Sequence, residues 1–344
     1  MATQDFSKLY YRTANCLTSD IIADFAPVSR VLGVDRSAGM GTLFTAMGTR
    51  FDMEYVAEEA FMATDNYEAD TRSIDDTPVT EAMRYIRGEL IKDGKVPEKY
   101  KSFVDCVVKG ESVYKQYKTY TDGQEDADIL FLISPAADAG KEAEQFQALA
   151  KKTGRRAFCT NRYKDCGYLR IQLSQFDSLE ETREELEKEL EKYELIVTDD
   201  GYVLDALLIV FPQLAGKIQF IDEFVHANKE VLQTAKEGRV AVHESGVIER
   251  LYPHRKVNYA DIFSKSEIVF PERSGYDVTD SGLAGGLGLA EPENMMAIAA
   301  RRMKDLSGLS HSVIVTPCAC EALGLNCAEK ENVVTLLDFV SSEI

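Results

Sequence analysis

Apolar positions change their spacing near residue 120, and this change predicts two kinds of structure in one chain. Before that point they recur three and four residues apart, with glycine and aspartate breaks between them, which predicts amphipathic helices. These helices are expected at residues 21–32, 41–51, 78–93 and 97–114. The next segment, residues 118–126, is polar and rich in turn-forming residues, and we interpret it as a linker.

After the linker, short apolar runs alternate with amphipathic stretches. This alternation predicts parallel β-sheets covered by helices, and therefore an α/β fold. Strands are expected at residues 129–133, 156–159, 194–198, 217–221, 239–242, 267–270 and 312–316. Helices are expected at residues 141–152, 178–192, 202–211, 222–237, 292–304 and 331–342.

The order of these elements repeats weakly within the chain. Residues 127–215 read as strand, helix, strand, a loop with the sequence Asp165-Cys166-Gly167, an acidic helix and a further strand. Residues 238–325 follow a similar order, with the loop Asp280-Ser281-Gly282 before the helix. Two copies of one α/β unit explain this order better than a single large sheet. We therefore expect a helical domain over residues 1–120 and α/β units over residues 121–235 and 236–344.

The composition narrows the classes of function. The 344 residues carry a net charge of −19, which is a poor match for nucleic acid, because its phosphates are neutralised by Lys and Arg. The sequence contains no run of about 18 apolar residues, so it predicts no membrane span. The first residues lack the basic and apolar regions of a signal peptide. We expect a cytoplasmic protein.

The cysteines are the main candidates for chemistry. There are seven, an odd number at irregular spacing, which predicts reduced thiols rather than a disulfide framework. Three of them, Cys166, Cys318 and Cys320, lie in loops next to expected strands. Glycines gather in the same loops, with Gly167 after Cys166 and with Gly282, Gly285 and Gly286 after Asp280-Ser281.

These loops resemble the cysteine-rich domain, or CCG domain, of heterodisulfide reductases and related iron–sulfur subunits. In that family, thiolates from three strand-end loops converge on a cluster, and one loop has the sequence Cys-Cys-Gly. In the second unit the Cys-Cys pair corresponds to Asp280-Ser281, and the final Cys-x-x-Cys segment keeps Cys318, with Cys320 at a different spacing. In the first unit the Cys-Cys-Gly loop corresponds to Asp165-Cys166-Gly167, and the final segment, Thr198-Asp199-Asp200-Gly201, has no thiol.

The N-terminal region resembles the helical ferredoxin domain of the iron–sulfur subunits of anaerobic glycerol-3-phosphate dehydrogenase and glycolate oxidase. That domain contains Cys-x2-Cys-x2-Cys-x3-Cys-Pro twice. The first copy here keeps the first cysteine, Cys16, and the proline, Pro27, with Ser19, Ile22 and Ala26 between them. The second copy, at residues 63–73, has no cysteine.

The resemblance implies vestigial cluster sites in a chain that has lost most of the ligands. Their remaining residues are Cys16, Cys166, Gly167, Asp280, Ser281, Gly282, Gly285, Gly286, Cys318 and Cys320. One or two thiols cannot hold a cluster that takes several, so we expect no iron–sulfur cluster and predict no other cofactor. The leading hypothesis is a cluster-free paralogue of an electron-transfer subunit, which acts as a structural or docking component of an oxidoreductase complex. Its expected partner is a flavoprotein or an iron–sulfur subunit.

A second hypothesis is a redox or metal protein with a residual site. The candidate thiols are those of Cys16, Cys166, Cys318 and Cys320. Cys327 and His311 lie near the last two in the sequence and could add ligands for zinc.

A third hypothesis is an enzyme or binding protein that takes a small organic ligand in the emptied clefts. Ligands of α/β proteins bind outside the carboxyl ends of parallel strands, where the Asp165 and Asp280 loops are expected. The glycines at residues 282–288 could cradle a phosphate, although they lack the spacing and the lysine of the known phosphate loops.

Overall fold

The computed structural model of the chain describes residues 49, 53–62, 67–72, 78–232, 234, 237–328 and 333–342. Cys16 and the helix expected at residues 21–32 lie outside these ranges, as does all of the segment 41–51 except Thr49. The ferredoxin-like character of the N-terminal region therefore stays a prediction.

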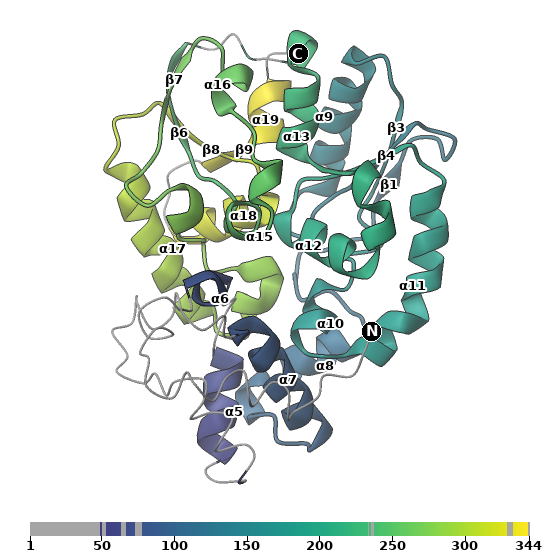
Figure 1. Ribbon diagram of the computed structural model, residues 1–344, viewed down its shortest axis with the longest axis vertical. Coiled ribbons are helices and arrows are strands. Elements are labelled where there is room, and N and C mark those ends of the chain that lie inside the picture. The colour runs from purple at the N-terminus through teal and green to yellow at the C-terminus, as the bar shows by residue number, and fades with distance from the viewer. Residues whose placement is uncertain are drawn as a thin grey trace.

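Helices from the N-terminal region pack together at one end of the molecule (Figure 1). They are α5 (Met53–Met62), α6 (Tyr67–Arg72), α7 (Val79–Lys92) and α8 (Glu98–Val108). Both α7 and α8 follow a proline, which needs no partner for a backbone N–H at a helix start. The two helices confirm the expectations for residues 78–93 and 97–114. The second is shorter than expected because Gly110, with φ of +67°, turns the chain away just after its end.

The first sheet contains the strands of the first α/β unit. They are β1 (Thr121–Asp122), β2 (Ile129–Leu132), β3 (Ala157–Thr160), β4 (Leu195–Thr198) and β5 (Ile218–Phe220), in the order β1-β3-β2-β4-β5. All neighbours are parallel except β1, which runs antiparallel to β3 at the edge. The covering helices are α9 (Ala139–Lys152), α10 (Tyr168–Gln172), α11 (Phe176–Glu191), α12 (Gly201–Val210), α13 (Ile221–Ala227) and α14 (Lys229–Leu232). Every residue of β2, β3 and β4 is buried, as expected for parallel strands covered on both faces.

The second sheet is wholly parallel. Its strands are β6 (Gly238–Val242), β7 (Ser266–Val269), β8 (Val313–Thr316) and β9 (Val333–Thr335), in the order β7-β6-β8-β9. Its helices are α15 (Gly246–Leu251), α16 (Tyr259–Ile262), α17 (Pro292–Ser307), α18 (Ala319–Ala328) and α19 (Leu336–Ser341). The short 3₁₀ helices among the described residues are η2 (Pro212–Lys217), η3 (Pro253–Arg255), η4 (Gly275–Asp277) and η5 (Ala284–Ala290).

The two sheets share one strand order, which confirms the expected repeat of an α/β unit. In each, the first parallel strand of the unit lies between the second and the third, and the fourth lies beyond the third. The seven expected strands are all present, with no end shifted by more than one residue.

The structure corrects four details of the sequence prediction. The supposed linker contains β1, an exposed strand that carries no apolar signal. The helix expected at residues 331–342 is the strand β9 followed by α19, and the β-branched residues Val333 and Val334 fit a strand better than a helix. The helix expected at 222–237 is interrupted at Asn228. Helix α18 was missed because apolar residues surround it on most sides and leave no helical period.

The two units pack against each other around one large core, which includes residues from Val56 in α5 to Val340 in α19. A second, smaller cluster lies within the second unit and includes Met303 and Ile314. The rings of Phe131 and Phe146 stack 4.0 Å apart under the first sheet, and Phe224 continues this row. In Figure 1 the helices α12, α15 and α18 lie between the two sheets. Within the described ranges, no helix has both the length and the apolar character needed to cross a membrane.

Candidate functional site

The carboxyl ends of strands from both units meet in the middle of the molecule. In an open parallel sheet, ligands bind where the chain switches direction across the sheet. This point lies between β2 and β4 in the first sheet and between β6 and β8 in the second. We call the residues gathered there the strand-end centre; they are Ser134, Asp199, Asp200, His243, Asp280, Ser281, Cys318, Cys320 and Glu321. All are buried, with exposed fractions of 0–2%.

Ser134 lies at the strand ends of the first sheet and donates hydrogen bonds to two aspartates. Its backbone nitrogen donates to Asp199 Oδ1 at 2.8 Å, and its hydroxyl donates to Asp200 Oδ2 at 2.6 Å. The other oxygen of Asp200 accepts from the backbone nitrogen of Tyr202 at 2.9 Å and so caps helix α12. Burial raises the pKa of Asp200 to about 6, although these hydrogen bonds act in the opposite direction.

The loop after β8 of the second unit reaches into the same crevice. The backbone nitrogen of Gly201 donates to Cys318 Sγ at 3.5 Å, and that of Ala319 donates to the carbonyl oxygen of Asp199 at 2.8 Å. Cys318 Sγ lies 4.0 Å from Asp200 Oδ1. The two units therefore fill each other's strand ends through direct contacts.

Glu321 holds the crevice of the second sheet. Its Oε2 accepts from the backbone nitrogen of Ser281 at 2.6 Å and lies 3.1 Å from His243 Nε2. Its Oε1 accepts from the hydroxyl of Tyr202 at 3.1 Å. The other ring nitrogen of His243, Nδ1, accepts from Arg302 Nε at 3.1 Å. This arrangement fixes His243 as the tautomer with its proton on Nε2, since a guanidinium only donates.

Electrostatics keep this histidine neutral. Burial lowers its pKa well below the usual value, and the neighbouring Arg302 charge lowers it further. Burial also lowers the pKa of Arg302 to about 10, so the guanidinium still carries its charge at neutral pH. His243 therefore acts as a fixed link between Arg302 and Glu321 rather than as an acid or base in contact with solvent.

Asp280 extends the network toward the N-terminal helices. Its Oδ1 accepts from the backbone nitrogen of Gly246 at 3.1 Å, and its Oδ2 pairs with Arg250 at 3.0 Å. Arg250 lies 3.7 Å from Glu68 in α6, and Glu68 pairs with Arg273 at 3.0 Å. Acidic and basic side chains of four segments thus pair with one another, and of these only Arg273 is partly exposed.

Three of the four thiols that the sequence singled out lie among the described residues, and their surroundings favour the protonated form. Burial raises the pKa of Cys318, of Cys320 and of Cys166 well above the usual value, and the Asp200 charge raises it further in all three. The hydroxyl of Tyr114 lies 3.7 Å from Cys320 Sγ. Because thiolates are the form that binds metal and attacks electrophiles, these three groups are poorly suited to either role.

The described residues of the strand-end centre offer two thiols, those of Cys318 and Cys320, for an iron–sulfur cluster. Cluster irons need several thiolates directed at one point. Among the described residues, no three or more His, Cys, Asp or Glu side chains are grouped to hold a metal ion. Cys327, which the zinc hypothesis adds, is exposed, whereas Cys318 is buried.

The glycines of the second unit allow close packing with neighbouring side chains. Gly282, Gly285 and Gly286 have φ values of +79°, +64° and +101°, which favour glycine. A Cβ on Gly282 would lie 2.9 Å from Ile298, and one on Gly285 would lie 2.5 Å from the Tyr168 ring. The glycine loop thus lies against side chains of both units rather than around an open cavity.

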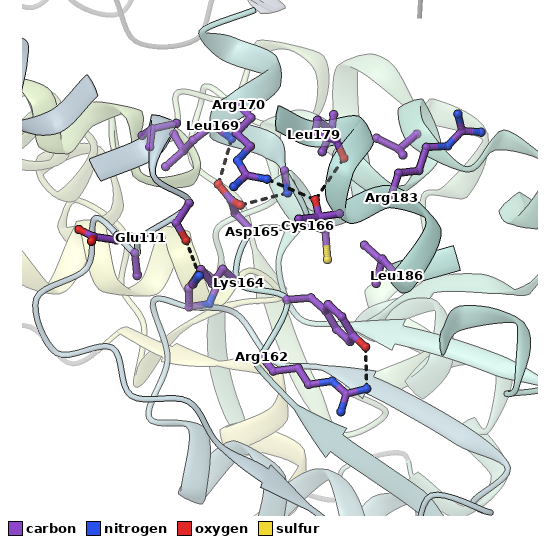
Figure 2. A pocket seen from close by; sticks show the side chains of 18 of the residues that line it. Glu111, Arg162, Lys164, Asp165, Cys166, Leu169, Arg170, Leu179, Arg183 and Leu186 are labelled. Atoms are coloured by element: carbon purple, nitrogen blue, oxygen red, sulfur yellow. Dashed lines mark hydrogen bonds between the residues drawn. The ribbon is translucent and has the colours of Figure 1, made fainter. Parts of the chain in front are cut away.

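The Asp165-Cys166-Gly167 loop lies beside a cavity of about 310 Å³ (Figure 2). The Asp165 carboxylate accepts from the backbone nitrogens of Gly167 at 3.1 Å and Leu169 at 2.9 Å, and thereby holds the loop. Cys166 has φ of +51°, an uncommon value for a residue with a side chain. Pro135 after β2 and Arg162 after β3 also line the cavity, so it lies outside the carboxyl ends of these strands.

Comparisons with known proteins do not assign this chain to a family. No family model matches the chain, and no curated protein or solved structure is significantly similar to it. The resemblance to the cysteine-rich domain therefore rests on the motifs of the sequence.

Sequence reasoning found the loops of this site but missed several residues that hold it. It placed Asp280, Ser281, Cys318 and Cys320 near one another, and the structure brings them together in the strand-end centre. It missed Glu321 and Arg302, which lie on helices and follow no motif. The sequence did contain a signal for Glu321, because this charged residue stands among the apolar residues of α18. In the structure its exposed fraction is 0%.

Proposed function

We propose that this protein is a cluster-free paralogue of an iron–sulfur electron-transfer subunit. It serves as a structural or docking component of a cytoplasmic oxidoreductase complex, with a flavoprotein or an iron–sulfur subunit as its partner. The resemblance to the cysteine-rich domain supplies the class of complex.

One observation carries the cluster-free part of the proposal. The loop of Cys318 occupies the strand ends of the other unit, where the Gly201 nitrogen donates to Cys318 Sγ at 3.5 Å. In the crevice of the second sheet, Glu321 accepts hydrogen bonds from the Tyr202 hydroxyl, His243 Nε2 and the Ser281 backbone nitrogen. A polar network that is buried and paired in this way favours a rigid core, and a cluster would have to displace it.

The docking proposal and the hypothesis of a residual redox site differ in whether the remaining thiols are needed. A docking component needs its fold and its surface, whereas a redox protein needs its sulfur atoms. Serine has nearly the size of cysteine, so the triple variant Cys166→Ser, Cys318→Ser and Cys320→Ser removes sulfur with little change in volume.

The test is purification of the tagged chain from its native cells without oxygen. The proposal predicts that a flavin-containing or cluster-containing protein accompanies the chain in equal amount, and that the triple serine variant retains this partner. Redox activity of the complex should also be unchanged in the variant. A chain that elutes alone contradicts the docking role, and a variant that keeps its partner but loses electron transfer favours the residual redox site.

A further inference from the structure

The cavity beside Cys166 differs from the strand-end centre because it is open to a ligand. Its volume of about 310 Å³ falls at the lower end of the range of small-molecule sites, roughly 300–1,000 Å³. Its walls are the loop at residues 110–114, the loop at residues 162–170, helix α11 and the end of helix α12. Figure 2 shows three of the lining residues, Asp165, Cys166 and Leu186 of α11, in this order across the view.

Two cations that line this cavity, Lys164 and Arg170, form no ion pair with a carboxylate among the described residues. Lys164 donates from Nζ to the carbonyl oxygen of Gly110. Arg170 donates from Nη1 to Ser178 O at 2.9 Å and to Thr182 Oγ1 at 3.2 Å. The hydrogen bonds of Lys164 and Arg170 thus go to backbone carbonyl and hydroxyl oxygens and to no described carboxylate. This is notable because acidic residues outnumber basic ones 58 to 39 in the sequence.

Both cations lie next to Gly110. A Cβ on Gly110 would lie 2.1 Å from Arg170 Nη2, while Lys164 binds the carbonyl group of Gly110. Three acids also line the cavity. Glu111 and Glu185 are exposed to solvent, which screens their charges. Asp165 has both oxygens occupied by backbone nitrogens. Burial raises the pKa of Asp165, and these hydrogen bonds and the Arg170 charge only partly oppose this effect. Lys164 and Arg170 thus supply partly buried positive charge beside Gly110.

Much of the remaining lining is apolar. It includes Val107, Leu179, Leu186, Val210 and Phe211. Arg162 and Arg183 also line the cavity, but they pair with Glu189 and Glu180 and so are already neutralised. The Cys166 thiol, protonated as described above, adds a weakly polar surface between the two ends.

We propose that this cavity binds a small organic anion with an apolar body. The anionic head group pairs with Lys164 and Arg170, and the body packs against Leu179, Leu186 and Phe211. A guanidinium and an ammonium directed at the same oxygens supply charge-assisted hydrogen bonds, which are stronger than neutral ones. This binding is independent of the docking role, because none of the residues of the strand-end centre lines the cavity.

Isothermal titration calorimetry with three probes tests both ends of the site. Octanoate has the head group and the body, octanol has the body without the charge, and acetate has the charge without the body. We expect octanoate to bind at least about tenfold more tightly than either of the others. Octyl phosphate distinguishes the head groups; tighter binding than octanoate assigns the same site to a phosphate ester.

Variants locate the site. Lys164→Gln should weaken octanoate binding at least about tenfold, since it removes one charge-assisted hydrogen bond. Lys188→Gln is the matched control, because Lys188 lies on α11 and is exposed but does not line the cavity. Leu186→Trp fills the cavity and should abolish binding while circular dichroism shows the fold intact. No binding of octanoate or octyl phosphate, or binding that neither Lys164→Gln nor Leu186→Trp weakens, overturns the proposal.

Discussion

The thiol of Cys318 lies 3.5 Å from the backbone nitrogen of Gly201, so the strand-end loop of one α/β unit is buried in the crevice of the other. The same two loops are joined by the hydrogen bond from Ala319 N to Asp199 O at 2.8 Å. The place where each unit by itself would offer a ligand site has become part of the core. Several of the predictions below follow from these buried contacts between the two units.

Glu321 should be the most sensitive residue of the strand-end centre. Glu321→Ala leaves Tyr202, His243 and the Ser281 nitrogen without an acceptor, and we expect it to lower the free energy of unfolding by about 3–5 kcal/mol. Glu321→Gln keeps an acceptor oxygen and should cost about 1–3 kcal/mol. Urea unfolding followed by circular dichroism measures both. The exposed Glu293→Gln is the control; equal losses in all three variants would contradict the role of Glu321.

Gly282 should not tolerate a side chain. It has φ of +79°, and a Cβ would lie 2.9 Å from the Ile298 side chain. Gly282→Ala therefore adds strain and crowding, and we expect a loss of at least about 1–2 kcal/mol of unfolding free energy. Gly216→Ala is the matched control, because nothing lies within 4 Å of its Cβ position and no positive φ is required. Thermal unfolding of the two variants compares them, and an unchanged midpoint for Gly282→Ala would show that this loop is not packed as described.

Asp200 should make stability depend on pH. Its pKa of about 6 in the folded protein exceeds the value of roughly 3.9 for an unfolded chain, so the folded state binds more protons between these values. The carboxyl therefore lowers stability as the pH rises from about 4 to about 6. Asp200→Asn removes this contribution, and its unfolding free energy relative to the unmodified protein should rise by on the order of 2–3 kcal/mol between about pH 4 and about pH 7.

Urea titrations at several pH values test this dependence. The exposed Asp177→Asn is the control, for which the difference from the unmodified protein should stay constant. A difference for Asp200→Asn that falls with rising pH would have the wrong sign for a buried carboxyl with a raised pKa.

His243 should remain neutral, with its proton on Nε2, across the physiological range. Burial and the Arg302 charge lower its pKa, so folding costs free energy once an unfolded histidine is protonated, below about pH 6.5. Nitrogen-15 NMR should show an unprotonated Nδ1 and a protonated Nε2 from about pH 6 to about pH 8. A fast-exchanging, titrating ring would mean that the side chain contacts water and that the hydrogen bonds to Arg302 and Glu321 are not formed.

The sequence predicted the sheets more successfully than the site. Apolar runs bounded by turns located β2 and β4, because parallel strands are buried on both faces and leave a continuous apolar signal. The short β1 escaped detection because both of its residues are exposed and only backbone hydrogen bonds define it. The repeat of loops pointed to the strand ends of both units, and the structure confirms one strand order in the two sheets.

The contacts across the strand ends could not be predicted from the sequence. Glu321 and Ser281 are 40 positions apart, and Arg302 and His243 are 59 apart, so no local pattern links them. That Lys164 and Arg170 form no ion pair with a described carboxylate depends on which acids lie nearby in space. In a chain with 58 acidic residues, charge counts alone would have assigned partners to both.

The central claim is that the strand-end centre is closed by its own side chains and holds no cluster. The most direct test is the content of iron and acid-labile sulfide in protein purified from native cells without oxygen. We predict far less than one iron atom per chain, in both the unmodified protein and the triple serine variant. A content near about four iron atoms per chain, lost in the serine variant, would mean that a cluster occupies this centre and would contradict the account.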